Sequence, residues 1–338
     1  MPSKKPAAHH KKGAESGKRA SAPRTPHLPA PLDLFLLLLS ALAAIMLLWQ
    51  SGGLGSLLDP SPGGRGVVKG ELTVHYIDVG QGDAALVVSP EGNAMLIDAG
   101  PGASASDLLR YLEQQEIRHL DYAVFTHPHE DHIGGADDVL NAIPTDTVIL
   151  SGGETDTATY ERMLDAIESS GAALLDAAAG AEYTLGSASF TILGPLGNRY
   201  SNLNDWSVVL RLRYGSTTFL FAGDAEKKVE EELLEFYANA KLKSTVLKAS
   251  HHGSDTSNTE AFLEAVHPKY VVISVGKNNT YGHPVASVLE RFAALGAEVH
   301  RTDEEGTVVL RSNGRTVTAP EGNSEQKLPW LDALFGKS

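Results

Sequence analysis

The larger part of the chain alternates short β-type apolar runs with longer segments in which apolar residues recur at helical spacing. In the first half, this pattern predicts strands over 72–78, 84–88, 94–98 and 122–125 and a helix over 104–115. In the second half, it predicts strands over 189–193, 207–214, 217–222, 245–248 and 270–274, helices over 225–237, 259–265 and 285–295, and two closing strands. The pattern indicates a mixed α/β domain, and the absence of a short-period repeat excludes a solenoid.

A separate apolar run precedes this domain. Residues 34–49 are apolar throughout except for Ser40, and Trp49 ends the run. No polar face interrupts this run, so it predicts a membrane-spanning helix over 32–50. The apolar run itself is slightly shorter than the ~20 residues usually needed. A cleaved signal peptide is the alternative, with a weak small-residue site near Gly53 and Gly55. We expect an uncleaved anchor, because the basic segment before it is long and no Ala-x-Ala follows.

Composition divides the remaining chain. Residues 1–31 carry seven Lys or Arg against Glu15 alone and predict a basic disordered tail. Residues 51–69 are rich in Gly and Pro and predict a linker, residues 70–318 form the globular domain, and 319–338 are a polar tail with one apolar cluster. The positive-inside rule places the basic tail in the cytoplasm and the domain outside the membrane. If the signal were cleaved, the domain would instead be secreted.

Charge and cysteine content limit the chemistry. Residues 51–338 carry 21 Lys or Arg and 40 Asp or Glu, a net charge of −19. An acidic protein of this kind repels polyanions at long range, which counts against tight nonspecific binding of DNA. Cysteine is absent, so disulfides and thiolate ligands are excluded. Any metal ion must be held by His, Asp or Glu.

One segment concentrates metal-binding chemistry. The sequence THPHEDH over 126–132 directly follows the strand predicted at 122–125, so its side chains lie on a loop at the carboxyl end of a strand. Three imidazoles and a carboxylate within six positions are improbable as packing, because each would need a buried partner. They predict ligands for one or two divalent cations, Zn²⁺ or Mn²⁺. The predicted ligands are His127, His129, Asp131 and His132.

This His-x-His-x-Asp-His string resembles the signature of the metallo-β-lactamase superfamily. The resemblance implies a four-layer αββα sandwich. It also implies that Asp98, in LIDAG, orients a ligating histidine and that Asp224, in FAGD, bridges two cations. A further ligand would come from SHHGS, where either His251 or His252 reaches the metal.

More narrowly, the chain resembles the extracytoplasmic hydrolase domain of the competence protein ComEC and its free-standing relatives, over about residues 70–311. The resemblance is carried by DVGQGD (78–83), NDWS (204–207), HHGS (251–254), YGHP (281–284) and RTD (301–303). It implies a hydrolase outside the membrane, in the first place a phosphodiesterase or nuclease that acts on single-stranded DNA. The multi-span channel of ComEC is missing, so DNA transport by this chain alone is not expected.

The chain departs from the wider superfamily at one ligand. Many members carry a third histidine for the first cation, whereas this chain has Asn204 and Asp205 at the corresponding place. Oxygen ligands there would bind one cation more weakly and suit Mn²⁺ as well as Zn²⁺. By the resemblance, we expect Asp205 and Asp131 to take part in the reaction, and Asn204 and Ser207 to support the ligands.

The implied mechanism is metal-assisted hydrolysis, in which two cations ~3.5–4 Å apart lower the pKa of a shared water towards ~7. His283 would protonate the leaving group or bind a substrate oxygen, although a structural loop histidine explains it nearly as well. Turn chemistry explains Asp78 and Asp83 almost as well as catalysis does. His75 on its strand is more simply a satisfied core or edge residue.

Two further functions stay open. One is hydrolysis of a smaller ester, such as phosphorylcholine on a wall polymer or a lactone, which the acidic surface suits better than long DNA. The other is a non-catalytic binding module, which would predict a broken ligand set. The ligands themselves do not select the substrate, because one fold hosts many reactions.

Overall fold

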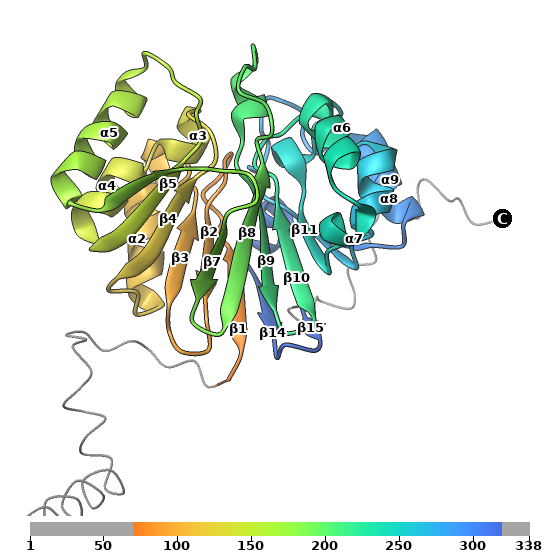
Figure 1. Cartoon of the computed structure of the whole chain (residues 1–338), viewed down its shortest axis with the longest axis horizontal. Helices are drawn as coiled ribbons and strands as arrows, with labels where there is room; N and C mark the ends of the chain where they lie inside the picture. Colours follow the sequence, from red (N-terminus) through yellow and green to blue (C-terminus); the bar gives the residue numbers. More distant parts are fainter. Residues whose placement is uncertain (1–69, 320–338) are drawn as a thin grey trace, which may run out of the picture. The chain divides into compact units, whose positions relative to one another are not determined.

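Two β-sheets pack face to face in the computed structural model, which describes residues 70–319, and helices cover both outer faces (Figure 1). Side chains from both sheets, among them Tyr76, Phe190 and Phe219, form the core between them. This arrangement confirms the predicted α/β fold with four layers. The basic tail, the predicted membrane helix, the linker and the polar tail lie outside the described residues. Within 70–319, no helix has both the length and the apolar character that crossing a membrane requires.

The first sheet combines antiparallel and parallel pairing. Strands β1 to β3 pair antiparallel, whereas β3 to β6 run parallel. Most of its strands are buried on both faces, which explains why they are continuous apolar runs and not alternating ones. In spatial order the strands are β15 (Val317–Thr318), β14 (Val308–Ser312), β1 (Leu72–Tyr76), β2 (Ala85–Val88), β3 (Ala94–Ile97), β4 (Leu120–Phe125), β5 (Thr145–Leu150) and β6 (Ala173–Asp176).

The second sheet repeats this division. Strands β7 to β10 pair antiparallel, and β10 to β13 run parallel. In spatial order the strands are β13 (Glu298–Arg301), β12 (Tyr270–Ile273), β11 (Val246–Lys248), β10 (Thr217–Phe221), β9 (Val209–Tyr214), β8 (Ala188–Gly194) and β7 (Glu182–Leu185).

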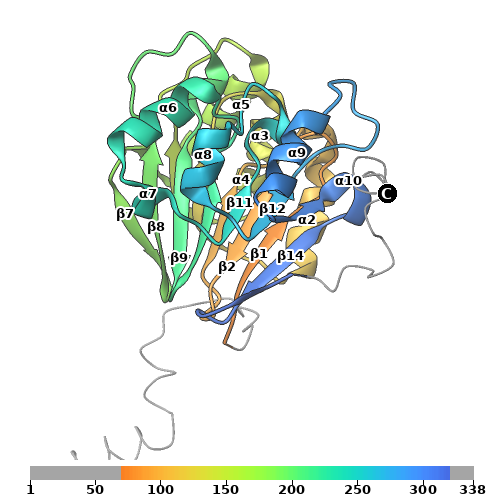
Figure 2. The same ribbon diagram turned by 90° about the vertical axis from the view of Figure 1, so that its right-hand side faces the viewer.

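Each outer face has its own helices and its own apolar core. Against the first sheet lie α2 (Ala105–Gln114), α4 (Ala136–Ala142) and α5 (Ala158–Ser170). Against the second lie α6 (Lys227–Phe236), α7 (Asn239–Leu242), α8 (Glu260–Val266) and α9 (Ala286–Ala294), several of which face the viewer in Figure 2. The short helices in the connections are η1 (Gly102–Ser104), α3 (Glu130–Ile133), η2 (Leu203–Trp206), η3 (Ser250–Gly253) and α10 (Thr302–Glu305).

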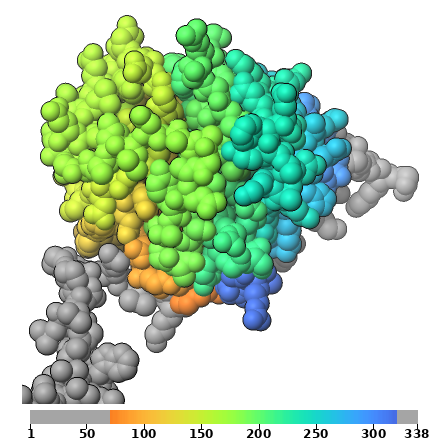
Figure 3. Space-filling model, viewed as in Figure 1, coloured from red at the N-terminus to blue at the C-terminus, as the bar shows by residue number. Residues whose placement is uncertain are grey.

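Local signals account for individual helix ends. The hydroxyl of Thr157 accepts a hydrogen bond from the Tyr160 N–H and caps α5, which ends at Gly171 in the left-handed conformation. Thr259 caps α8 in the same way. In the space-filling view, the middle of the chain, coloured green, lies between the helices of the first half and those of the second (Figure 3).

The predicted strands and helices are found within a few residues of their expected bounds. The elements between the THPHEDH segment and β8 were not predicted: α4, β5, α5, β6 and β7. Within the described residues, three strands and not two follow α9, namely β13, β14 and β15.

Candidate metal centre

The predicted ligands come from loops at the carboxyl ends of parallel strands in both sheets. His127 follows β4, Asp224 follows β10 and His252 follows β11. Parallel pairing puts strand ends side by side: β3 and β4 are in register at Ile97 and Val124, and β10 and β11 at Phe221 and Lys248. The two sheets therefore deliver their loops to one edge of the sandwich.

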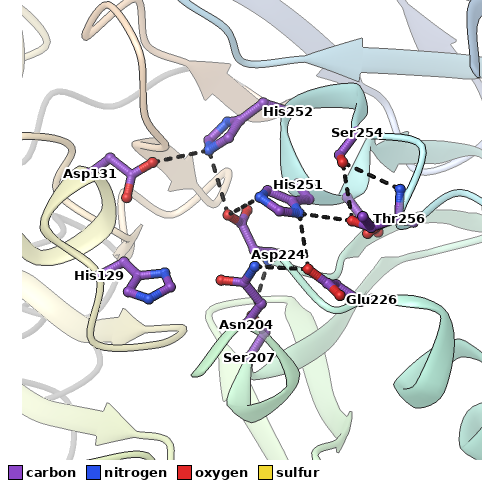
Figure 4. A network of polar contacts seen from close by, with 12 residues as sticks. His129, Asp131, Asn204, Ser207, Asp224, Glu226, His251, His252, Ser254 and Thr256 are labelled. Carbon is purple, nitrogen blue, oxygen red and sulfur yellow. Dashed lines mark hydrogen bonds and ion pairs between the residues drawn. The ribbon is translucent and has the colours of Figure 1, made fainter. Parts of the chain in front are cut away.

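Four donors meet closely enough to hold one cation. We call Asp131, His132, Asp224 and His252 the four-donor half-site; one ligand atom of each lies within 4.8 Å of the others. His132 Nε2 is 3.3 Å from Asp224 Oδ1. His252 Nε2 is 3.3 Å from Asp131 Oδ2 (Figure 4). Two ligands bound at ~2.1 Å to one ion lie about 3.0–3.5 Å apart, so these spacings fit a divalent cation.

Two atoms of this group lack a hydrogen-bond partner, which adds a second argument for this fit. His132 Nε2 and Asp224 Oδ1 are buried and make no hydrogen bond. Leaving such atoms unpaired in a protein interior is costly, and native structures rarely do so without a reason. A cation between them would satisfy both, and nitrogen and carboxylate oxygen are donors that Zn²⁺ and Mn²⁺ accept. The residues present therefore fit a metal ion.

His127 and His129 form a second, less complete group, which we call the two-histidine half-site. His127 Nε2 lies 3.0 Å from His129 Nδ1, a spacing that also suits two ligands of one ion. His127 Nε2 lies 3.9 Å from the carboxylate oxygen Asp224 Oδ2. Asp224 thus stands between the two half-sites, the place expected for a bridging ligand.

Hydrogen bonds behind the imidazoles fix which nitrogen faces the site. His132 Nδ1 donates to Asp98 Oδ2 at 2.8 Å, and His252 Nδ1 donates to the Ser274 carbonyl at 2.9 Å. Asp98 also accepts from the backbone N–H and the hydroxyl of Thr126, both at 2.7 Å. Each Nε2 is thereby left as an acceptor for a cation.

The two adjacent histidines of SHHGS differ in their surroundings. His252 is buried and its Nε2 contacts Asp131 and Asp224, so it lies within the four-donor half-site. His251 lies at the rim, where its Nδ1 is 3.2 Å from the Thr256 hydroxyl and its Nε2 is 3.7 Å from Asp224 Oδ2 (Figure 4).

The NDWS segment lies beside the two-histidine half-site. Ser207 Oγ is 3.3 Å from His127 Nδ1 and accepts the Asp224 N–H at 3.0 Å, so it links His127 to Asp224. The Asn204 amide donates to Glu226 at 3.0 Å, and its Oδ1 is buried without a hydrogen-bond partner. Asp205 is buried, and its Oδ1 accepts the Glu226 N–H at 3.3 Å.

Strained backbone accompanies the ligands. Asp98, His251 and His252 all have positive φ, at 57°, 49° and 52°. Non-glycine residues rarely adopt this conformation, and strain of this kind gathers at functional sites. Gly223 is also left-handed, and a Cβ there would lie 2.9 Å from Ser207 Oγ. Only glycine fits at this position, directly before Asp224.

Charge sets the protonation of the centre. Burial disfavours the charged form of His252, but Asp224 and Asp83 outweigh it and raise its pKa to about 10. Burial also disfavours the charged form of His132, but the neighbouring carboxylates outweigh this effect and raise the pKa of His132 well above its usual value. His127 behaves in the opposite way, because burial and the neighbouring His132 lower its pKa. Without a cation, protons neutralise the carboxylates, so a metal ion must displace them.

The remaining predicted histidines have distinct places. The His283 ring is half-buried, with its centroid 5.5 Å from that of His251 and 5.9 Å from the exposed ring of Tyr281. Its Nδ1 is buried without a partner. His75 is buried and hydrogen-bonds Tyr111 and Thr73, which agrees with a satisfied strand residue.

Two residues were missed or undervalued by sequence reasoning. Asp83 is buried behind the four-donor half-site, with its Oδ1 3.4 Å from His252 Nδ1, whereas Asp78 is exposed. Lys248 is buried at the end of β11 and forms an ion pair with Asp83. The available signal was a lone lysine ending an apolar strand just before the SHHGS segment.

The chain is similar to known proteins over most of its length. Residues 77–277 match the Metallo-beta-lactamase superfamily. ComE operon protein 3 of Bacillus subtilis is 32% identical over 265 residues, which cover 73% of this chain and 34% of that protein. Competence protein ComA of Neisseria gonorrhoeae is 32% identical over 289 residues, which cover 82% of this chain and 38% of that protein. The chain thus spans little more than a third of the length of these relatives.

Among solved structures, CmlA, a diiron beta-hydroxylase from Streptomyces venezuelae, superimposes with a TM-score of 0.50. The match covers 75% of this chain and 55% of CmlA, at 14% sequence identity. At this identity the similarity concerns the fold alone.

Proposed function

Because the chain belongs to the metallo-beta-lactamase superfamily, we propose that it is a metal-dependent phosphodiesterase with single-stranded DNA as its substrate. The observation that carries the hydrolase assignment is the convergence of four donors, two of which, His132 Nε2 and Asp224 Oδ1, are buried without a hydrogen-bond partner. The choice of a phosphodiester is supported by the similarity to Competence protein ComA and by the motifs that resemble the hydrolase domain of ComEC.

The chain's own residues would hold the reaction in place. Asp131, His132 and His252 would bind one cation, His127 and His129 the other, and Asp224 both. When bound, divalent cations supply an activated water and stabilise charge that develops on a phosphoryl oxygen. Asp98 and Ser207 hold the imidazoles of His132 and His127 in their orientations, so little reorganisation is needed during the reaction.

His283 would act on the substrate and not on the metal. Burial and the neighbouring His251 lower its pKa, which keeps the ring neutral near pH 7. A neutral imidazole donates a hydrogen bond but is a weak proton donor. We therefore assign His283 to a hydrogen bond with a substrate oxygen, in preference to protonation of the leaving group.

The test uses the full-length chain, stripped of metal and reloaded with Mn²⁺ or Zn²⁺. Hydrolysis of bis(p-nitrophenyl) phosphate and of single-stranded DNA is expected only after reloading. Cleavage of the small diester but not of DNA would favour a smaller natural substrate. Metal binding without turnover of either compound would favour a binding module.

A smaller ester is the second candidate, and the charge of the chain favours it. Residues 51–338 carry a net charge of −19, which opposes the approach of a long polyanion. A phosphorylcholine ester or a lactone meets less repulsion. Activity on DNA that rises with ionic strength would confirm this repulsion and favour the smaller ester, whereas activity that falls with ionic strength would show attraction and support DNA.

We also propose that the domain acts outside the membrane, held by the segment 32–50. The proposal rests on the apolar run and the basic residues before it. Protease added to intact cells is expected to cleave the domain. Cleavage only after lysis would reverse the proposed orientation.

A further inference from the structure

A buried lysine lies directly behind the candidate metal centre, where no ligand role explains it. Lys248 ends β11 and is 3% exposed, and its ammonium group forms an ion pair with the Asp83 carboxylate. Burying a lysine costs free energy unless its charge is compensated, and even a compensated buried ion pair is weak evidence for stability. We therefore expect this pair to have a function.

Asp83 connects the lysine to the ligands. Its Oδ1 is 3.4 Å from His252 Nδ1, and its Oδ2 is 3.9 Å from His132 Nδ1. Its backbone N–H donates to the Asp131 carbonyl at 3.0 Å, and its carbonyl accepts the Gly100 N–H at 2.8 Å. The ion pair is therefore fixed to the loops that carry the four-donor half-site.

The charges around the centre show what the lysine changes. Four carboxylates face or back it, namely Asp83, Asp98, Asp131 and Asp224, and all are mostly or fully buried. With neutral imidazoles, Lys248 reduces their total charge from −4 to −3. Two divalent cations then leave an excess of one positive charge, which suits an anionic substrate. Without the lysine, the loaded centre would be neutral.

We propose that Lys248 is a positioning residue that sets the charge of the metal centre through Asp83. Its ammonium weakens the hold of the carboxylates on the cations and preserves a net positive charge for an anionic diester. The inference rests on the proposed metal-dependent function, since it concerns how strongly this site binds its cations.

Opposite changes at the two members of the pair provide the test. In the full-length chain, Lys248→Met removes a buried positive charge and should tighten Mn²⁺ binding by about tenfold or more. Asp83→Asn removes a negative charge and should weaken it by a similar factor. The double variant Lys248→Met with Asp83→Asn should return to within about threefold of the wild-type affinity. Chelator competition measures the affinities, and circular dichroism confirms folding.

The outcomes separate this inference from the proposed function. If both single variants weaken Mn²⁺ binding while the wild type binds well, the pair only supports the structure and the inference fails. If the wild type binds no Mn²⁺ or Zn²⁺, the proposed function itself fails. If Lys248→Met does not fold, the comparison of Asp83→Asn with the double variant decides: recovery in the double variant supports the inference, and none overturns it.

Discussion

The two half-sites of the centre share Asp224 but differ in how completely the fold assembles them. In the four-donor half-site, donors from both sheets already lie at spacings that suit one ion. In the two-histidine half-site, both imidazoles come from one loop, and Asp224 Oδ2 is 3.9 Å from His127 Nε2. The difference teaches that one cation should bind more tightly than the other, because less reorganisation is needed to bind it.

Removal of His132 should have the largest effect, because it breaks the half-site that is complete. His132→Ala leaves the carboxylates of Asp98 and Asp224 without their buried partner. We expect kcat/KM for bis(p-nitrophenyl) phosphate to fall by roughly a thousandfold or more, beyond the 10–100-fold typical of residues behind the ligands. Elemental analysis should show loss of bound metal.

His119→Ala is the matched control. His119 forms an exposed ion pair with Asp146, and with Asp121 these residues form a group of described residues, separate from the proposed centre, whose donors lie close enough for a cation. Unchanged activity and metal content in this variant would attribute both to the proposed centre. Activity near wild type in His132→Ala would contradict the assignment.

The four-donor half-site should also make the stability of the metal-free protein depend on pH. The folded pKa of His252, about 10, lies above its ordinary value of 6.5. The contribution of protonated His252 to the free energy of unfolding is therefore complete below about pH 6.5 and is lost as the pH rises through 10. The free energy of unfolding falls by at most about 1.4 kcal/mol per pH unit for each proton released. Urea unfolding at pH 7 and pH 10 measures the loss.

Two comparisons check the cause of this pH dependence. In His252→Gln the decrease should be smaller, because the titrating group is absent. Loading with metal should also reduce it, because a cation replaces the proton. An equal decrease in all three samples would show that other groups cause it.

A change in the two-histidine half-site should be milder. His129→Ala removes one of its two imidazoles but leaves all members of the four-donor half-site. We expect bound metal to fall from two ions to one and kcat/KM to fall by roughly 10–100-fold. Loss of both ions in this variant would show that the half-sites are not separable.

The smallest effect is expected at His283, which lies outside both half-sites. His283→Ala should lower kcat/KM by roughly tenfold, the value of one hydrogen bond, with metal content unchanged. His283→Asn retains an N–H donor and should recover part of the loss. Equal losses in both variants would exclude the assigned hydrogen bond, and loss of metal would place His283 among the ligands.

The sequence predicted the site best where the donors are close in the chain. His127, His129, Asp131 and His132 lie in one segment, and a preceding strand indicates the edge that they occupy. The choice between His251 and His252 could not be made, because it depends on positive φ at both residues and on the Ser274 carbonyl from the next strand.

Long-range pairing explains the other omissions. Asp83 and Lys248 are 165 positions apart, and only the packing of one sheet against the other brings them together. The alternating elements indicated the fold, but the region from α4 to β7 was missed, although α5 has apolar residues at helical spacing between Thr157 and Gly171. Its edge strand β6 is exposed at every residue, so burial leaves no pattern in its sequence.

A calorimetric titration of the metal-free, full-length chain with Mn²⁺ tests the unequal half-sites most directly. We predict two binding steps of different affinity, with the tighter step lost in His252→Ala and the weaker step lost in His129→Ala. Two equal steps, the reverse assignment, or no binding of Mn²⁺ or Zn²⁺ would contradict this account.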